Sequence, residues 1–172
     1  MRIISLAILI IIGLTSCTRT VEIPENKVGI VYDIKTKDVV DRVFESGKHS
    51  ISTSSDIALF DTTDQKLNFS FDILFKDATS AVIDFSIQYK LRVDNLPKVC
   101  KNYEAALEIP LEENVLLVTV RSQIRKQFLE VDKGGLSTDT IFDMIEKNLR
   151  TQESITEMIE INSFSRGQIS GL

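Results

Sequence analysis

The sequence is poor in the residues from which metal centres and disulfide frameworks are built. Its 172 residues include one histidine, two cysteines and no tryptophan. A lone histidine without a cysteine pair cannot supply the clustered ligands that a zinc site needs. No Gly-x-Ser-x-Gly nucleophile motif occurs either. We therefore expect a protein that is not an enzyme and that holds no metal or other cofactor.

The few residues that could carry chemistry have simpler structural interpretations. His49 lies in a Gly/Ser-rich stretch, which favours the role of a turn residue. Two carboxylate pairs, Asp61 with Asp64 and Glu112 with Glu113, have no further motif around them and are typical of a solvated edge. A hydrolase built on an unfamiliar carboxylate pair is left as an alternative.

Neither sign of charge is concentrated in one block. Lys and Arg number 20 and Asp and Glu number 25, which gives a net charge of −5. Without a basic block, nucleic acid and anionic lipid head groups are poor candidates as partners. Attachment to a membrane would therefore have to come from something other than charge.

Long apolar runs are also missing, apart from a short one at the start of the chain. Arg2 precedes an apolar stretch from Ile3 to Leu14, broken only by Ser5 and Gly13. As a helix this stretch would span about 18 Å, which is too short for a hydrocarbon core of about 30 Å. A basic residue, a short apolar stretch and small residues after it indicate a secretory signal peptide.

The residues that end this segment, Leu14-Thr15-Ser16-Cys17, resemble the bacterial lipobox. The resemblance implies a lipoprotein signal peptide over residues 1–16, cleavage before Cys17, and acylation of Cys17 with fatty acids such as palmitate. Two or three acyl chains give durable membrane anchoring. We expect a bacterial envelope protein on the periplasmic face of the inner or outer membrane, or on the cell surface. The alternative is an ordinary signal peptide followed by a chance cysteine.

Cys100 would then be the one remaining thiol. It lies in the apolar-periodic stretch of Leu96, Val99 and Tyr103, which predicts a small buried hydrophobic residue. The alternative is a reactive or intermolecular thiol, although no basic group is clearly placed to activate it.

The sequence of the N-terminal half predicts a series of strands. Residues 17–26 are expected to be a tether. Lys27–Tyr32 and Val39–Phe44 are rich in β-branched residues and predict a hairpin. Residues 45–50 are expected to be a loop, and Ile57–Thr62 another strand.

The clearest β signal follows. Apolar residues alternate with polar ones over Leu67–Phe75 and again over Val82–Val93, joined by the polar link 76–80. This period of two predicts a long antiparallel hairpin with one buried and one wet face. The wet face is either a lateral contact surface or simply solvated. Its expected residues are Asn68, Ser70, Asp72, Ser86, Gln88, Lys90 and Arg92.

The pattern then becomes helical. A short helix is predicted over Leu96–Leu107, with Asp94 or Asn95 as its cap and Pro97 in its first turn. A longer amphipathic helix is predicted over Glu112–Asp132, with an apolar stripe at three- and four-residue steps.

Gly134-Gly135 is expected to terminate that helix, since it lacks the Lys-Ser/Thr of a phosphate-binding loop. A third helix is predicted to start at Ser137 or Thr138 and to bury Ile141, Ile145 and Leu149. Residues 155–164 are expected to form a final strand and 165–172 a short polar tail.

The order of these elements resembles the SPFH or band 7 domain shared by prohibitins, stomatins and flotillins. Local likenesses are KVGIVYD at 27–33, FESGKH at 44–49, the strand 81–93 with Leu96-Pro97 after it, and the helices at 118–128 and 137–149. The resemblance implies an α+β fold over residues 27–164. An antiparallel sheet in the N-terminal half would pack against helices of the C-terminal half.

The resemblance also implies a role. Members of the family are non-enzymatic membrane scaffolds that self-associate or dock on membrane proteins. Most carry a long coiled coil, but no sustained heptad pattern occurs here. We therefore expect a lipid-anchored scaffold or adaptor with a membrane-protein partner or lateral self-association.

Two other possibilities arise from the residues. A small apolar ligand could bind between the sheet and the long helix, in a pocket lined by Phe69, Phe71, Phe85 or Phe128. Separately, the tripeptides that contain Thr62 and Thr140 resemble a short bacterial O-glycosylation pattern.

Overall fold

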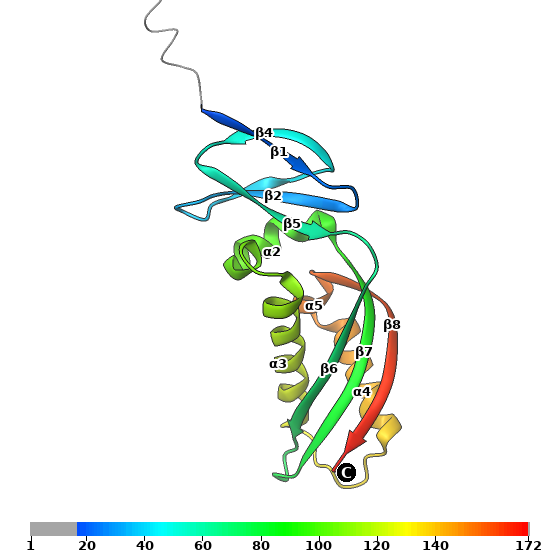
Figure 1. Cartoon of the computed structure of the whole chain (residues 1–172). Coiled ribbons are helices and arrows are strands. Elements are labelled where there is room, and N and C mark those ends of the chain that lie inside the picture. The colour runs from blue at the N-terminus through cyan, green and yellow to red at the C-terminus, as the bar shows by residue number, and fades with distance from the viewer. Residues whose placement is uncertain (1–16, 172) are drawn as a thin grey trace, which may run out of the picture.

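The computed structural model describes residues 17–171. The expected signal peptide at residues 1–16 and the side chains of Glu112 and Glu113 lie outside this description. The molecule is elongated, with a β-rich part at the N-terminal end and a longer part made of a curved sheet and helices (Figure 1). The α+β fold predicted from the sequence is confirmed.

Five short strands form the N-terminal part. Strand β1 pairs with β4 in one layer, and β2 lies between β3 and β5 in the other; every pair is antiparallel. Gly29 on β2 lies where the two layers meet: a Cβ atom there would come within 2.9 Å of Ile23 Cδ1 on β1, in the other layer. The strands are β1 (Thr18–Ile23), β2 (Lys27–Asp33), β3 (Val39–Phe44), β4 (Gly47–Ser52) and β5 (Ser55–Asp61).

Two predictions in this part are wrong. Residues 17–26 are not a tether, because Thr18–Ile23 form β1, and residues 45–50 are not a loop, because β4 begins at Gly47. Both strands are short and mostly polar, so they carry little apolar periodicity. They form because their backbones pair with each other, from Thr18 opposite Ser52 to Ile23 opposite Gly47. The β2–β3 hairpin was predicted correctly.

The longer part is built on a three-stranded antiparallel sheet in the order β6-β7-β8. Its strands are β6 (Gln65–Leu74), β7 (Ser80–Leu91) and β8 (Ile159–Ser170). The predicted hairpin of β6 and β7 is confirmed. The predicted polar tail is wrong up to Ser170, because residues 165–170 continue β8 and pair with β7. Their side chains are mostly exposed, so the sequence there looks like a tail.

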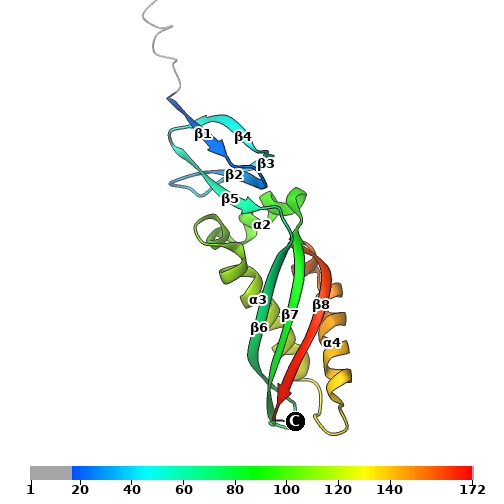
Figure 2. The same cartoon turned by 45° about the vertical axis from the view of Figure 1, so that its right-hand side comes forward.

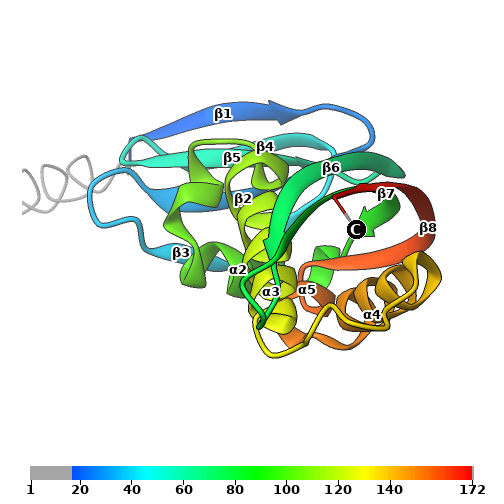
Figure 3. The ribbon, with the colours of Figure 1, turned by 90° about the horizontal axis from the view of Figure 1, so that it is seen from below.

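Helices α3 (Leu117–Phe128) and α4 (Thr138–Thr151) lie side by side on one face of this curved sheet (Figure 3). The predicted apolar stripes are buried, for example Ile124 and Phe128 on α3 and Ile145 on α4. Ser137 caps α4, since its Oγ accepts a hydrogen bond from Thr140 N at 3.1 Å.

Other helix boundaries differ from the sequence prediction. The stretch 96–107 is divided at Tyr103 into α2 (Leu96–Asn102) and a 3₁₀ turn, η2 (Glu104–Leu107). The long helix begins with a π-helical segment, η3 (Glu112–Leu116), and its α-helical part ends at Phe128. A 3₁₀ turn, η1 (Val93–Asn95), precedes α2, and α5 (Glu153–Thr156) precedes β8.

One hydrophobic core joins the two parts. Tyr32 and Phe60 of the N-terminal strands belong to the same cluster of buried residues as Ile87 of the long sheet and the inner residues of the helices. Aromatic rings fill its centre: Phe69 and Phe85 stack at 4.6 Å. Because this core is continuous, we expect both parts to unfold together.

Replacing Phe128 by alanine should destabilise the protein strongly. Phe128 is fully buried at the base of α3, and its ring meets Phe75 edge to face at 5.5 Å. We expect a loss of about 3–5 kcal/mol in the free energy of unfolding. The matched control is Leu129→Ala, since Leu129 is 50% exposed and should cost less than about 0.5 kcal/mol. Urea unfolding followed by circular dichroism measures both, and equal losses would contradict this account of the core.

Candidate functional site

The expected acylation site lies at one tip of the molecule. Cys17 is exposed and immediately precedes β1. The layer of β1 and β4 forms the end of the molecule farthest from the long sheet (Figure 1). Its carbonyl oxygen accepts a hydrogen bond from Thr53 N at 3.0 Å, which ties it to the turn between β4 and β5. A group attached to the Cys17 sulfur would therefore be held close to the folded domain.

The second thiol lies in a different environment. Cys100 on α2 is fully buried, and this burial raises the pKa of its thiol to about 12. The prediction of a small buried hydrophobic residue is confirmed, and the alternative of a reactive thiol is not supported.

His49 has a structural role on β4. Its Nε2 lies 2.7 Å from the carbonyl oxygen of Glu45, and its ring meets Phe44 edge to face at 5.4 Å. These contacts hold the corner between β3 and β4. His49 is thus a strand residue beside the turn and not a residue of the turn itself.

Two of the carboxylates singled out in the sequence accept hydrogen bonds within the domain. Asp61 accepts hydrogen bonds from the backbone N and the Oγ1 of Thr63, which lower the pKa of its carboxyl group. Asp64 accepts one from Asn162 Nδ2 at 2.9 Å. Within residues 17–171, no cluster of three or more His, Cys, Asp or Glu side chains could hold a metal ion.

The two threonines of the O-glycosylation pattern are engaged through their hydroxyl groups. Thr62 Oγ1 donates to the carbonyl oxygen of Asn26 at 2.9 Å, and Thr140 Oγ1 lies 2.8 Å from Ser137 Oγ. Glycosylation would have to replace these hydrogen bonds. Modification of either residue stays a prediction.

The phenylalanines that were expected to line a ligand pocket pack against one another. Phe71 meets Phe85 edge to face at 6.2 Å, in addition to the Phe69–Phe85 stack and the Phe75–Phe128 contact. These rings belong to the core between the sheet and the helices. On the opposite, wet face of the sheet, Phe69 and Phe85 contribute to a shallow hollow of about 470 Å³ with polar neighbours such as Ser70 and Ser86.

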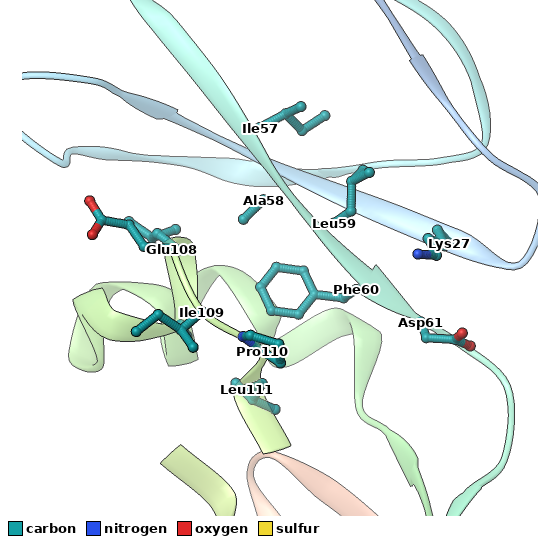
Figure 4. Close-up of a pocket in the computed structure, with 12 residues that line it drawn as sticks. Lys27, Ile57, Ala58, Leu59, Phe60, Asp61, Glu108, Ile109, Pro110 and Leu111 are labelled. Carbon is teal, nitrogen blue, oxygen red and sulfur yellow. The ribbon is translucent and has the colours of Figure 1, made fainter. Parts of the chain in front are cut away.

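A second hollow lies where the two parts of the molecule meet. It has a volume of about 450 Å³ and runs between β5 and residues 106–111. Figure 4 shows Phe60 directed toward Ile109 and Pro110, with Asp61 near one end of the hollow and Glu108 near the other. This groove could not be predicted from the sequence, because residues distant in the chain form its two walls.

The predicted wet face of the long hairpin is solvent-facing. Asn68, Ser70 and Asp72 on β6 and Gln88 and Lys90 on β7 are exposed. The alternation along β6 and β7 fixes which face is wet. Lateral contact through this face stays a prediction.

The comparison with protein families agrees with the fold. A sequence model described as "SPFH domain / Band 7 family" matches residues 21–162, which reach from β1 into β8. The chain belongs to this family. SPFH proteins commonly associate with membranes and oligomerise, and the family is generally non-enzymatic. A search of curated proteins returned no match. None of the helices within residues 17–171 combines the length and the apolar character that a membrane span requires.

The Cys100 thiol should resist labelling in the folded SPFH protein. Because its pKa is raised to about 12, the reactive thiolate is scarce at pH 8 and at pH 10, and burial also blocks access of the reagent. Labelling with an aromatic disulfide reagent should be slow at both pH values and rapid in urea. The exposed Cys17, in protein that carries no lipid, serves as the internal control. Labelling of both thiols at equal rates in the folded state would contradict the burial of Cys100.

Proposed function

We propose that this SPFH protein is a non-enzymatic, lipid-anchored scaffold or adaptor of a bacterial cell envelope. Family membership supports the membrane-associated, scaffold-type role. The lipobox-like Leu14-Thr15-Ser16-Cys17 supports the anchor. The observation that carries the proposal is the position of Cys17, exposed at one tip and directly ahead of the first strand.

The proposed anchor would hold the domain close to the membrane. Strand β1 begins at Thr18, so no linker separates the lipidated residue from the folded domain. A free tether of nine residues would allow roughly 30 Å of separation, at about 3.3–3.6 Å per residue. Without one, the β1–β4 layer would lie at the head groups. The long sheet and its helices would project from the membrane, where they can meet partners.

Acylation of Cys17 makes a direct prediction. Wild-type protein should incorporate labelled palmitate and remain in the membrane fraction at high salt, because acyl chains, unlike charges, are not screened. Cys17→Ala should lose the label and be released from the membrane. Cys100→Ala, which removes the other cysteine, should keep both properties. Labelling of Cys17→Ala, or its full retention at high salt, would refute the anchoring mechanism.

Self-association makes a second prediction. The native mass of the lipidated protein, extracted in mild detergent, should be many times the 19.4 kDa of the chain. The wet face of the long sheet is the surface that we propose for lateral contact. Cys17→Ala serves as the control for assembly that depends on the anchor. A clean monomer in mild detergent, and also after cross-linking in membranes, would contradict self-association.

A ligand-binding lipoprotein is the second candidate function. The specific observation in its favour is the groove of about 450 Å³ between β5 and residues 106–111, with Leu59, Phe60 and Ile109 in its lining. A thermal-shift screen against lipids and metabolites distinguishes the two functions. Reproducible stabilisation by one class of compound would favour the binder, since a ligand of the native state raises its stability.

A further inference from the structure

One face of α3 combines exposed apolar side chains with unpaired positive charge. Val118 is 57% exposed and Leu129 50% exposed, and Arg121, Arg125 and Lys126 lie between them on the helix. Together these five residues form what we call the α3 stripe. The described part of the chain contains eight ion pairs, and no residue of the stripe takes part in them.

The cations of the stripe repel one another. Arg121 and Arg125 are separated by four residues and therefore lie on the same side of α3, an arrangement that destabilises a helix when the charges are alike. In addition, the Nε of Arg121 is buried and has no hydrogen-bond partner in the described structure. An acidic partner would relieve the repulsion between the two guanidinium groups.

The two arginines are held in place before any partner arrives. Both guanidinium groups lie over the ring of Phe71 on β6, Arg121 at 5.5 Å and Arg125 at 5.8 Å from its centre. Arg125 Nε also donates to the carbonyl oxygen of Asp72 at 2.9 Å. Such contacts lower the entropy that the side chains lose on binding.

The stripe borders two neighbouring hollows, which together we call the α3 groove. A hollow of about 410 Å³ lies over the stripe itself, and one of about 470 Å³ lies between α3 and β6; Arg125 and Leu129 line both. The exposed Leu74 adds apolar surface to the second hollow. The groove faces away from α4, because the α4 side of α3 is marked by Gln127, whose Nε2 donates to the carbonyl oxygen of Met144.

We propose that the α3 stripe binds an acidic amphipathic helix of a partner protein. Val118 and Leu129 are eleven residues apart, or roughly 16 Å along the helix axis, so the partner helix needs about three turns to reach both. It would place apolar side chains on these two residues and carboxylates opposite the three cations. This specifies the partner of the adaptor role proposed above and rests on that role.

Charge and position disfavour other occupants. The acidic side chains of a second copy's α4 are already paired within the chain: Asp139 and Asp143 with Arg166, and Glu146 with Arg150. The membrane surface is also disfavoured, since α3 lies beside the long sheet, whereas β1, which follows Cys17 directly, lies at the other end of the molecule (Figure 2). An acidic helix from a different protein fits the stripe better than either.

The test uses full-length protein in a neutral detergent and a synthetic helix of about 16 residues with one leucine face and one glutamate face. We expect the protein to bind this peptide, to bind it more weakly as salt rises, and not to bind a counterpart with lysine in place of glutamate. The variant Val118→Glu/Lys126→Glu should bind at least about tenfold more weakly. These two side chains make no hydrogen bond or ion pair among the described contacts, so the variant should fold.

The matched control is Val40→Glu/Lys35→Glu. It makes the same substitutions at an exposed valine (43%) and an exposed lysine of the N-terminal part, and it should bind like wild type. Equal binding by the two variants, equal binding of the lysine peptide, or no binding by wild type would overturn the proposal. The proposal would also be overturned if the stripe variant still bound the peptide and instead lost binding to anionic vesicles. The same holds if it still bound the peptide and instead showed a lower native mass. Because binding is measured without a membrane, failure here is distinct from failure of acylation at Cys17.

Discussion

The fold depends on the strict alternation of β7. Every second residue of this strand, from Ala81 through Ile87 to Leu91, is buried on one face, and the strand is paired along both edges. A shift of one residue in register would expose that whole apolar set. With β7 fixed, β6 and β8 must align beside it, and the helices have a defined apolar surface to cover. The C-terminal strand is thereby held by backbone pairing even where its own side chains are polar.

A sheet with open edges invites pairing with other chains, and arginine side chains occupy several of these edges. Arg125 donates to the carbonyl oxygen of Asp72 on β6, and Arg150 to that of Ile161 on β8. Arg19 does the same at Ser55 on β5, with Asp56 as its ion-pair partner. These contacts satisfy backbone acceptors that have no neighbouring strand. Pairing with another strand at these positions would have to displace the arginine side chains.

The elements that could be predicted from the sequence are those whose buried residues recur at a regular spacing. The β6–β7 hairpin and the inner faces of α3 and α4 bury apolar residues at regular steps, so each element could be recognised from its own sequence. Strands β1 and β4 and the end of β8 could not, because they exist through pairing with segments distant in the chain. The same holds for the α3 stripe. The sequence places Arg121 and Arg125 on the outer side of a helix, but only the fold brings them over Phe71.

The two ends of the molecule therefore suit different tasks. Cys17 lies at the tip of the β1–β4 layer, and the hydrogen bond from Thr53 N to its carbonyl oxygen keeps that end close to any lipid it carries. The α3 stripe lies on the other part, beyond the junction at β5 (Figure 1). The continuous core between the parts resists a hinge, since bending would separate Phe60 from the residues it packs against. A partner bound at α3 would then be held at a fixed distance from Cys17.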